Sequence, residues 1–95
     1  MAGCLPLNRL YESESVVAFY HPKPSYRVHI LIVPKRSIAN ICAVKGNEMR
    51  IIADIVVAAQ QLVRQLGLDA EGYRLVTNGG KYQDVRQLHF HLISE

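Results

Sequence analysis

The sequence predicts an α+β domain, in which antiparallel strands pack around one long helix. A long central stretch repeats apolar residues at helical spacing, runs of β-branched and aromatic residues flank it, and Pro or Gly residues separate these segments. No repeat or low-complexity linker divides the sequence, so we expect residues 1–95 to form a single domain. A chain of this size buries only about 60–65% of its unfolded surface, which favours a homodimer.

Two strands are predicted before the helix. Residues 15–20 are rich in β-branched and aromatic types and end at the turn 21–24, whose two prolines exclude helix and ladder pairing. Residues 27–33 form a nearly continuous apolar run closed by Pro34, which is typical of a central strand covered on both faces. His29 is the unusual member of that run.

The central stretch predicts an amphipathic helix of about five turns from Asn47 to Leu66. Its expected ends are Asn47 as N-cap, Glu48 in the first turn, and Gly67 in the left-handed conformation beyond the last turn. The expected inward face recurs at steps of three and four residues: Ile52, Ile55, Val56, Ala59, Leu62, Val63 and Leu66.

Two further strands are predicted after the helix, at residues 73–77 and 88–93. An Asn-Gly-Gly turn at 78–80 and a polar loop to Arg86 separate them. Alternation along the last strand places Leu88, Phe90 and Leu92 toward the core.

The opposite face of the last strand carries Gln87, His89 and His91. Residues two apart on a strand place these side chains roughly 6.5–7 Å from each other. A neutral imidazole is abundant at pH 7 because its ordinary pKa is about 6.5, and it can attack phosphorus to form a phosphoryl-histidine that water hydrolyses. The row therefore indicates a phosphate site.

This segment resembles the histidine triad (HIT) family, whose signature is His-φ-His-φ-His-φ-φ. Residues 87–93 match every position except the first histidine, which is Gln87, and residues 29–35 look like the family's His-φ-φ-φ-φ-Pro-Lys strand. The order of elements is also similar over roughly residues 10–94. The resemblance implies a HIT-like fold: an antiparallel sheet of about five strands with one long and one short helix.

The resemblance also implies catalytic roles. His89 would be the nucleophile that accepts a nucleoside monophosphate, and His91 would assist at the phosphate and the leaving group. Gln87 would support the site in place of the first histidine, although Gln cannot carry a proton at neutral pH.

The substrate-binding residues implied by the resemblance are His29 and Asn78 near the phosphate and Phe19 in the base pocket. His21 stands where an acidic residue usually grips the ribose, and Gly80 would let the backbone approach the phosphate. Residues 78–80 also fit an ordinary turn, and His21 also fits an exposed turn residue.

The leading functional prediction is hydrolysis or transfer of a nucleoside monophosphoryl group, most simply a phosphoramidase reaction on purine nucleoside monophosphate amidates or anhydrides, without a cofactor. One alternative is a purine nucleotide-binding module without turnover, which Gln87 and His21 motivate. Another is a metal site formed by His89, His91 and Glu95, because metals accept such ligands.

Net charge and cysteine content limit which binding partners and which cellular compartment we expect. The net charge of +3 comes from basic residues spread along the chain, unlike the clustered stripe of nucleic-acid binders. Cys4 and Cys42 form no finger or redox motif, so we expect free thiols in a reducing cytoplasm. No apolar run approaches about 18 residues, so we expect neither a membrane segment nor export.

Overall fold

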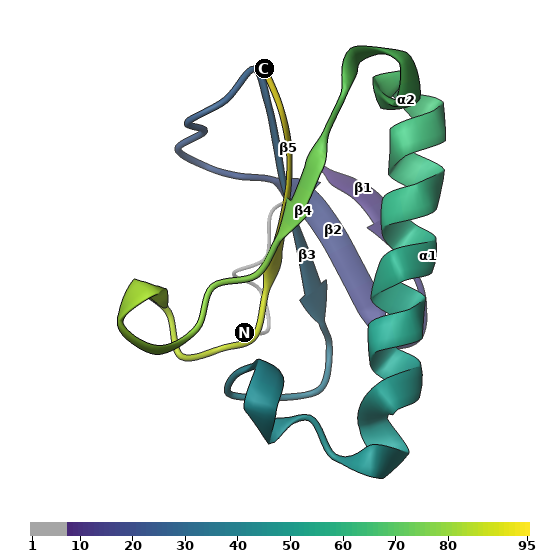
Figure 1. Cartoon of the computed structure of the whole chain (residues 1–95). Coiled ribbons are helices and arrows are strands. Elements are labelled where there is room, and N and C mark those ends of the chain that lie inside the picture. Colours follow the sequence, from purple (N-terminus) through teal and green to yellow (C-terminus); the bar gives the residue numbers. More distant parts are fainter. Residues whose placement is uncertain (1–7) are drawn as a thin grey trace.

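The structure is a computed structural model that describes residues 8–95. One antiparallel sheet and one long helix form its two layers (Figure 1), which confirms the predicted α+β class. In spatial order the strands are β1 (Arg9–Glu12), β2 (Val16–Tyr20), β3 (Val28–Pro34), β5 (Phe90–Ser94) and β4 (Arg74–Val76). The helices are α1 (Met49–Gln65) and the short α2 (Leu68–Glu71).

The central strand β3 pairs with β2 on one side and with β5 on the other. Its residues Ile30 and Ile32 are fully buried on the side that α1 covers. Alternation turns His29 and Leu31 to the opposite side, where His29 is buried and Leu31 is only partly covered. The predicted burial of both faces is therefore complete only on the helix side.

Helix α1 packs against β1, β2 and β3 and buries Ile55, Leu62 and Val63 as predicted. Val56 is 43% exposed, so its assignment to the inward face was wrong. Ala58 is fully buried instead, because the sheet contacts the helix along a stripe rotated toward the 55, 58, 62 positions.

The helix begins later than predicted, and Asn47 is not its N-cap. Residues 46–48 form a 3₁₀ turn that precedes α1, and Asn47 is exposed within it. Glu48 is buried instead, accepting a hydrogen bond from the Lys45 amide at 3.0 Å and pairing with Arg36. The predicted C-terminal end is confirmed, since Gly67 has φ 69°.

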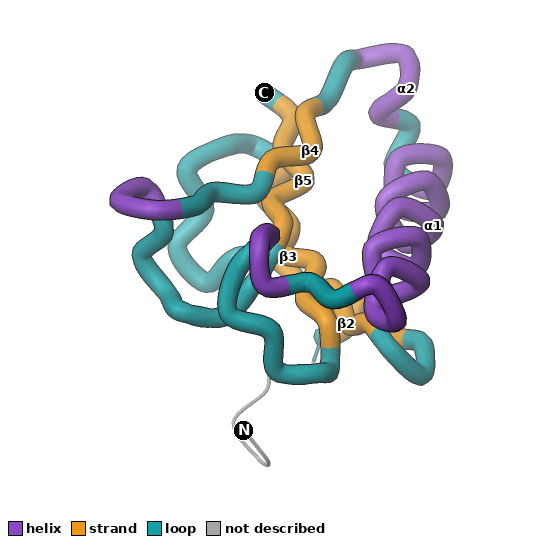
Figure 2. The backbone as a smooth tube through the Cα atoms, turned by 60° about the horizontal axis from the view of Figure 1, so that its bottom comes forward, coloured by secondary structure: helices purple, strands orange, loops and turns teal. Residues whose placement is uncertain are grey.

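The remaining features of the fold are the edge strand β1 and the loops that connect the strands. Strand β1 had no signal of its own in the residue pattern, and Cys4 lies outside the described residues. Within residues 8–95, neither helix combines the length and apolarity that crossing a membrane requires. The loops 21–27 and 77–89 lie on the side of the sheet away from α1 (Figure 1 and Figure 2). Alternation along β3 and β5 turns His29 and His91 to this same side.

Candidate active site

All four histidines of the sequence gather in one row on the open side of the sheet. His21, at the end of β2, stacks on His29 with ring centroids 4.4 Å apart. His29 on β3 neighbours His91 on β5 at 5.1 Å, and His91 neighbours His89 at 5.0 Å. Three strands thus bring together residues that lie up to 70 positions apart in the sequence, because β2, β3 and β5 are adjacent in the sheet.

Hydrogen bonds assign the tautomers of His29 and His91. The backbone amide of Ser25 donates to His29 Nδ1 at 3.1 Å, so the proton of a neutral His29 is on Nε2. That Nε2–H points at His91 Nδ1, 2.9 Å away, which must then be the acceptor. His91 consequently carries its own proton on Nε2 and offers a hydrogen-bond donor.

His89 has the opposite tautomer. Its Nδ1 lies 2.7 Å from the backbone oxygen of Gln87, which can only accept, so the proton is on Nδ1. The lone pair of His89 is therefore on Nε2. The site therefore sets a hydrogen-bond donor on His91 beside an unprotonated ring nitrogen on His89, and such a pair can combine nucleophilic attack with hydrogen bonding to the reacting group.

The predicted spacing of the triad residues was wrong. The rings of His89 and His91 are 5.0 Å apart instead of the expected 6.5–7 Å. Strand β5 starts only at Phe90, so residues 87–89 bend back far enough for His89 to reach the Gln87 carbonyl. The Gln87 side chain does not join the imidazole row, since its amide donates to the Arg36 carbonyl at 3.4 Å.

The remaining predicted residues border the row. Phe19 pairs with Leu31 and Leu31 with His91, so Phe19 lies on the same side of the sheet, two strands from His91. Val76 pairs with His91, which brings Asn78 toward His89 at the end of β4. Gly80 has φ 59° at the start of a 3₁₀ turn, and glycine adopts this conformation without strain.

Burial keeps the middle of the row neutral. It lowers the pKa of His91 to about 4, helped by the neighbouring His89, His29 and His21 and opposed by the charge of Asp84. Burial also lowers the pKa of His29, and His21 adds to this effect. At neutral pH His91 is thus an uncharged donor.

We expect acid to destabilise the fold below pH 6.5. The unfolded chain protonates His91 near 6.5 and the folded protein only near 4, so the unfolded state binds more protons between these values. Stability is unaffected above about 6.5 and falls as the pH decreases toward 4. A loss of only about 1 kcal/mol would lower Tm by about 4–8 °C. Thermal unfolding from pH 7.5 to 4 measures this, and the variant His91→Gln should show a weaker dependence; an equal dependence would contradict the assignment.

Sequence reasoning missed the backbone donors that orient the row. The amide of Lys23 donates to His21 Nδ1 at 2.9 Å, and the amide of Ser25 holds His29. Thr77 Oγ1 donates to the His89 carbonyl at 2.8 Å. Backbone amides leave no signal in residue type. For Thr77 the only available signal was its position next to Asn78.

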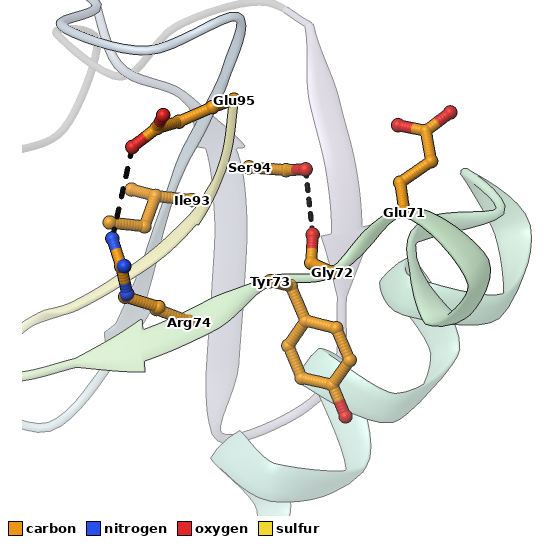
Figure 3. A pocket seen from close by; sticks show the side chains of 7 residues that line it. All are labelled: Glu71, Gly72, Tyr73, Arg74, Ile93, Ser94 and Glu95. Atoms are coloured by element: carbon orange, nitrogen blue, oxygen red, sulfur yellow. Dashed lines mark hydrogen bonds and ion pairs between the residues drawn. The ribbon is translucent and has the colours of Figure 1, made fainter.

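Two shallow hollows elsewhere contain none of the residues predicted for the nucleotide site, although Glu95 of the alternative metal site lines the first of them. One lies where residues 71–74 face residues 93–95 (Figure 3), with Ser94 Oγ donating to the Gly72 carbonyl at 2.7 Å and Arg74 3.8 Å from the Glu95 carboxylate. The other lies between residues 11–15 and the first turns of α1. Among residues 8–95, no group of three or more His, Cys, Asp or Glu side chains is arranged to hold a metal ion.

The antiparallel sheet, its single long helix and the imidazole row define a protein with a histidine-based site on the open face of an α+β fold. The family model of the HIT domain matches residues 3–95, and the chain belongs to the HIT family. It is 35% identical over 94 residues to an uncharacterized HIT-like protein of Helicobacter pylori, covering 97% of this chain and 88% of that protein.

Solved structures agree with this assignment. A HIT family hydrolase from Clostridium thermocellum superposes with a TM-score of 0.89 at 40% identity, covering 96% of this chain and 81% of that one. A histidine triad nucleotide-binding protein from Candida albicans superposes with a TM-score of 0.80 at 28% identity, covering 93% of this chain and 65% of that one.

Proposed function

We propose that the chain is a nucleotide-binding HIT protein that hydrolyses or transfers a nucleoside monophosphoryl group through a nucleotidyl-His89 intermediate. The observation that carries this proposal is the pair of opposite tautomers: a free lone pair on His89 Nε2 beside a donor on His91 Nε2. The simplest substrates are purine nucleoside monophosphate amidates, which makes the activity a phosphoramidase.

In the first step His89 Nε2 attacks phosphorus and forms a P–N bond, while the bond from phosphorus to the leaving amine breaks. The leaving amine takes one proton from solvent, and the water that attacks in the second step returns one proton to solvent, so the protons balance over the cycle. The positive charge that develops on the His89 ring is stabilised by the Gln87 carbonyl, which accepts its Nδ1–H. His91 Nε2–H donates to a phosphoryl oxygen or to the leaving atom. In the second step water attacks phosphorus, loses a proton, and releases the monophosphate and neutral His89.

The remaining site residues bind the nucleotide in this proposal. Phe19 and Leu31 supply a partly exposed apolar surface beside the row, suited to a purine base. His21 accepts from the Lys23 amide on Nδ1, so its Nε2–H is a donor for a ribose oxygen. Asn78 and the backbone at Gly80 contact the phosphate.

Trapping the intermediate tests the proposal directly. The protein is incubated with an adenosine monophosphoramidate labelled in the adenylyl group, quenched in base, which preserves phosphorylated histidine, and analysed by mass spectrometry. We expect an adenylyl group on the peptide that contains His89. Nucleotide turnover without any adduct on His89 would overturn the mechanism.

A purine nucleotide-binding module without turnover is the second candidate. The observation that favours it is the low pKa of His91, about 4, which leaves no protonated imidazole there to give the leaving amine its proton at neutral pH. Titration calorimetry with a nucleoside monophosphate separates the two candidates. Micromolar affinity with no hydrolysis of the amidate supports binding alone, and hydrolysis excludes it.

We also propose that two copies pair through strand β4. β4 is the last strand in the sheet order, so its outer backbone groups can pair with a copy of itself around a two-fold axis. Leu75 on β4 is 36% exposed, Tyr73 directly before β4 is 51% exposed, and Val57 on α1 is 50% exposed. We expect Leu75→Lys to convert a dimer to a monomer in size-exclusion chromatography with light scattering, whereas Ile41→Lys, at an exposed site elsewhere, leaves the dimer intact. A wild-type monomer would refute this pairing.

We also propose that the protein resides in a reducing compartment such as the cytoplasm. Cys42 is free and exposed, and an exposed thiol persists best where glutathione keeps thiols reduced. Thiol labelling of the protein in intact cells measures this, and we expect Cys42 to react as a free thiol.

A further inference from the structure

The loop that leads into His89 is hydrogen-bonded to the connection between β3 and α1, although the two segments are distant in the sequence. The Leu88 amide donates to the Ile38 carbonyl at 2.7 Å. The Gln87 side chain adds a longer bond to the Arg36 carbonyl. Residues 36–39 therefore run beside residues 83–88 and support the bend from which His89 projects.

Gln83 makes the strongest side-chain link between these two segments. Its single Nε2 group donates to the Ala39 carbonyl at 2.7 Å and to the Val85 carbonyl at 2.9 Å. One bond crosses to the neighbouring segment and the other closes the loop two residues ahead of Gln87. The side chain uses both hydrogens of its amide, so it acts as a clamp on the segment 83–88.

The position of the Gln87 carbonyl decides the tautomer of His89. That carbonyl is the group that draws the proton to Nδ1 and leaves the lone pair on Nε2. A shift of about 1 Å in a positioning element can cost a large factor in rate. The clamp at Gln83 therefore acts on the site through the backbone of residues 85–87.

We propose that Gln83 is a positioning residue that fixes the tautomer and orientation of His89 by clamping the segment 83–88 to residues 36–39. The proposal rests on His89 as nucleophile for its kinetic consequence, but the tautomer itself is observable without substrate. Glu48 contributes to the same support, because its buried carboxylate pairs with Arg36, whose carbonyl faces Gln87.

Imidazole ¹⁵N NMR of the free protein provides the test, together with steady-state kinetics on an adenosine monophosphoramidate. In the wild type we expect His89 protonated on Nδ1. In Gln83→Leu, which lacks both donors, we expect a mixture of His89 tautomers and a kcat lower by about 10-fold, with KM nearly unchanged. Gln83→Glu retains the shape and also lacks the amide donors, so it should behave alike. Gln61→Leu, on the exposed face of α1, is the matched control.

The possible outcomes distinguish failure of the proposed Gln83 clamp from failure of the proposed catalysis by His89. A Gln83 variant that stays folded and keeps both the wild-type His89 tautomer and the wild-type kcat overturns the proposal, while hydrolysis by His89 would stand. A tautomer shift in a protein that shows no hydrolysis supports the clamp and refutes the proposed enzyme. If Gln83→Leu fails to fold, Gln83→Glu gives the same readings.

Discussion

The variant His89→Ala is expected to lose nucleotide transfer by about 10³-fold or more and to form no covalent adduct. The loss is large because Nε2 of His89 carries the lone pair placed for attack, while the other ring nitrogen donates to the Gln87 carbonyl. His91 cannot take over, since its Nδ1 is occupied by the His29 donor and its Nε2 bears the proton. Steady-state hydrolysis of an adenosine monophosphoramidate, with mass spectrometry of the quenched protein, measures both effects.

A cavity variant provides the control for this result. His89→Gly leaves room for a free imidazole, and we expect added imidazole to restore part of the turnover without labelling the protein. Gln60→Ala, on the exposed face of α1, should retain the wild-type rate. Substantial hydrolysis by His89→Ala in the absence of imidazole would refute covalent catalysis at this residue.

The histidines could be found in the sequence because alternation and a short motif locate them without tertiary information. His91 lies on β5 and His29 on β3, at positions that the strand pattern predicts, and the adjacent antiparallel strands bring them together. The geometry of His89 could not be predicted, because it depends on a bend at residues 87–89 that ends the strand earlier than the apolar alternation suggests.

In the fold, too, some elements could be predicted from the local sequence pattern, whereas others depend on contacts with distant residues. The long helix and four strands follow from local periodicity and from the Pro and Gly residues that separate the segments. The start of α1 does not, because the buried Glu48 pairs with Arg36 from a distant segment and holds a 3₁₀ turn where Asn47 would cap a longer helix. Val56 was misassigned for the same reason: the sheet decides which of several apolar stripes faces inward.

Variants of His29 are expected to produce the second large effect, and two amide substitutions separate its two contacts. His29 accepts from the Ser25 amide on Nδ1 and donates to His91 on Nε2. Gln is long enough to place an amide near the original Nε2, so His29→Gln retains a donor to His91. Asn reaches only as far as Nδ1, so His29→Asn loses that donor. We expect kcat to fall by about 10–100-fold in His29→Asn and clearly less in His29→Gln.

The order of these two variants identifies what His29 does. If its main role is to set the proton of His91 on Nε2, ¹⁵N NMR should show His91 protonated on Nε2 in His29→Gln and a tautomer mixture in His29→Asn. If its main role is to hold the loop 21–27 through Ser25, the order reverses, because Asn retains an acceptor near Nδ1 and Gln does not. The shared row of imidazoles predicts the first order, since the His29 to His91 bond, at 2.9 Å, is shorter than the 3.1 Å bond from the Ser25 amide.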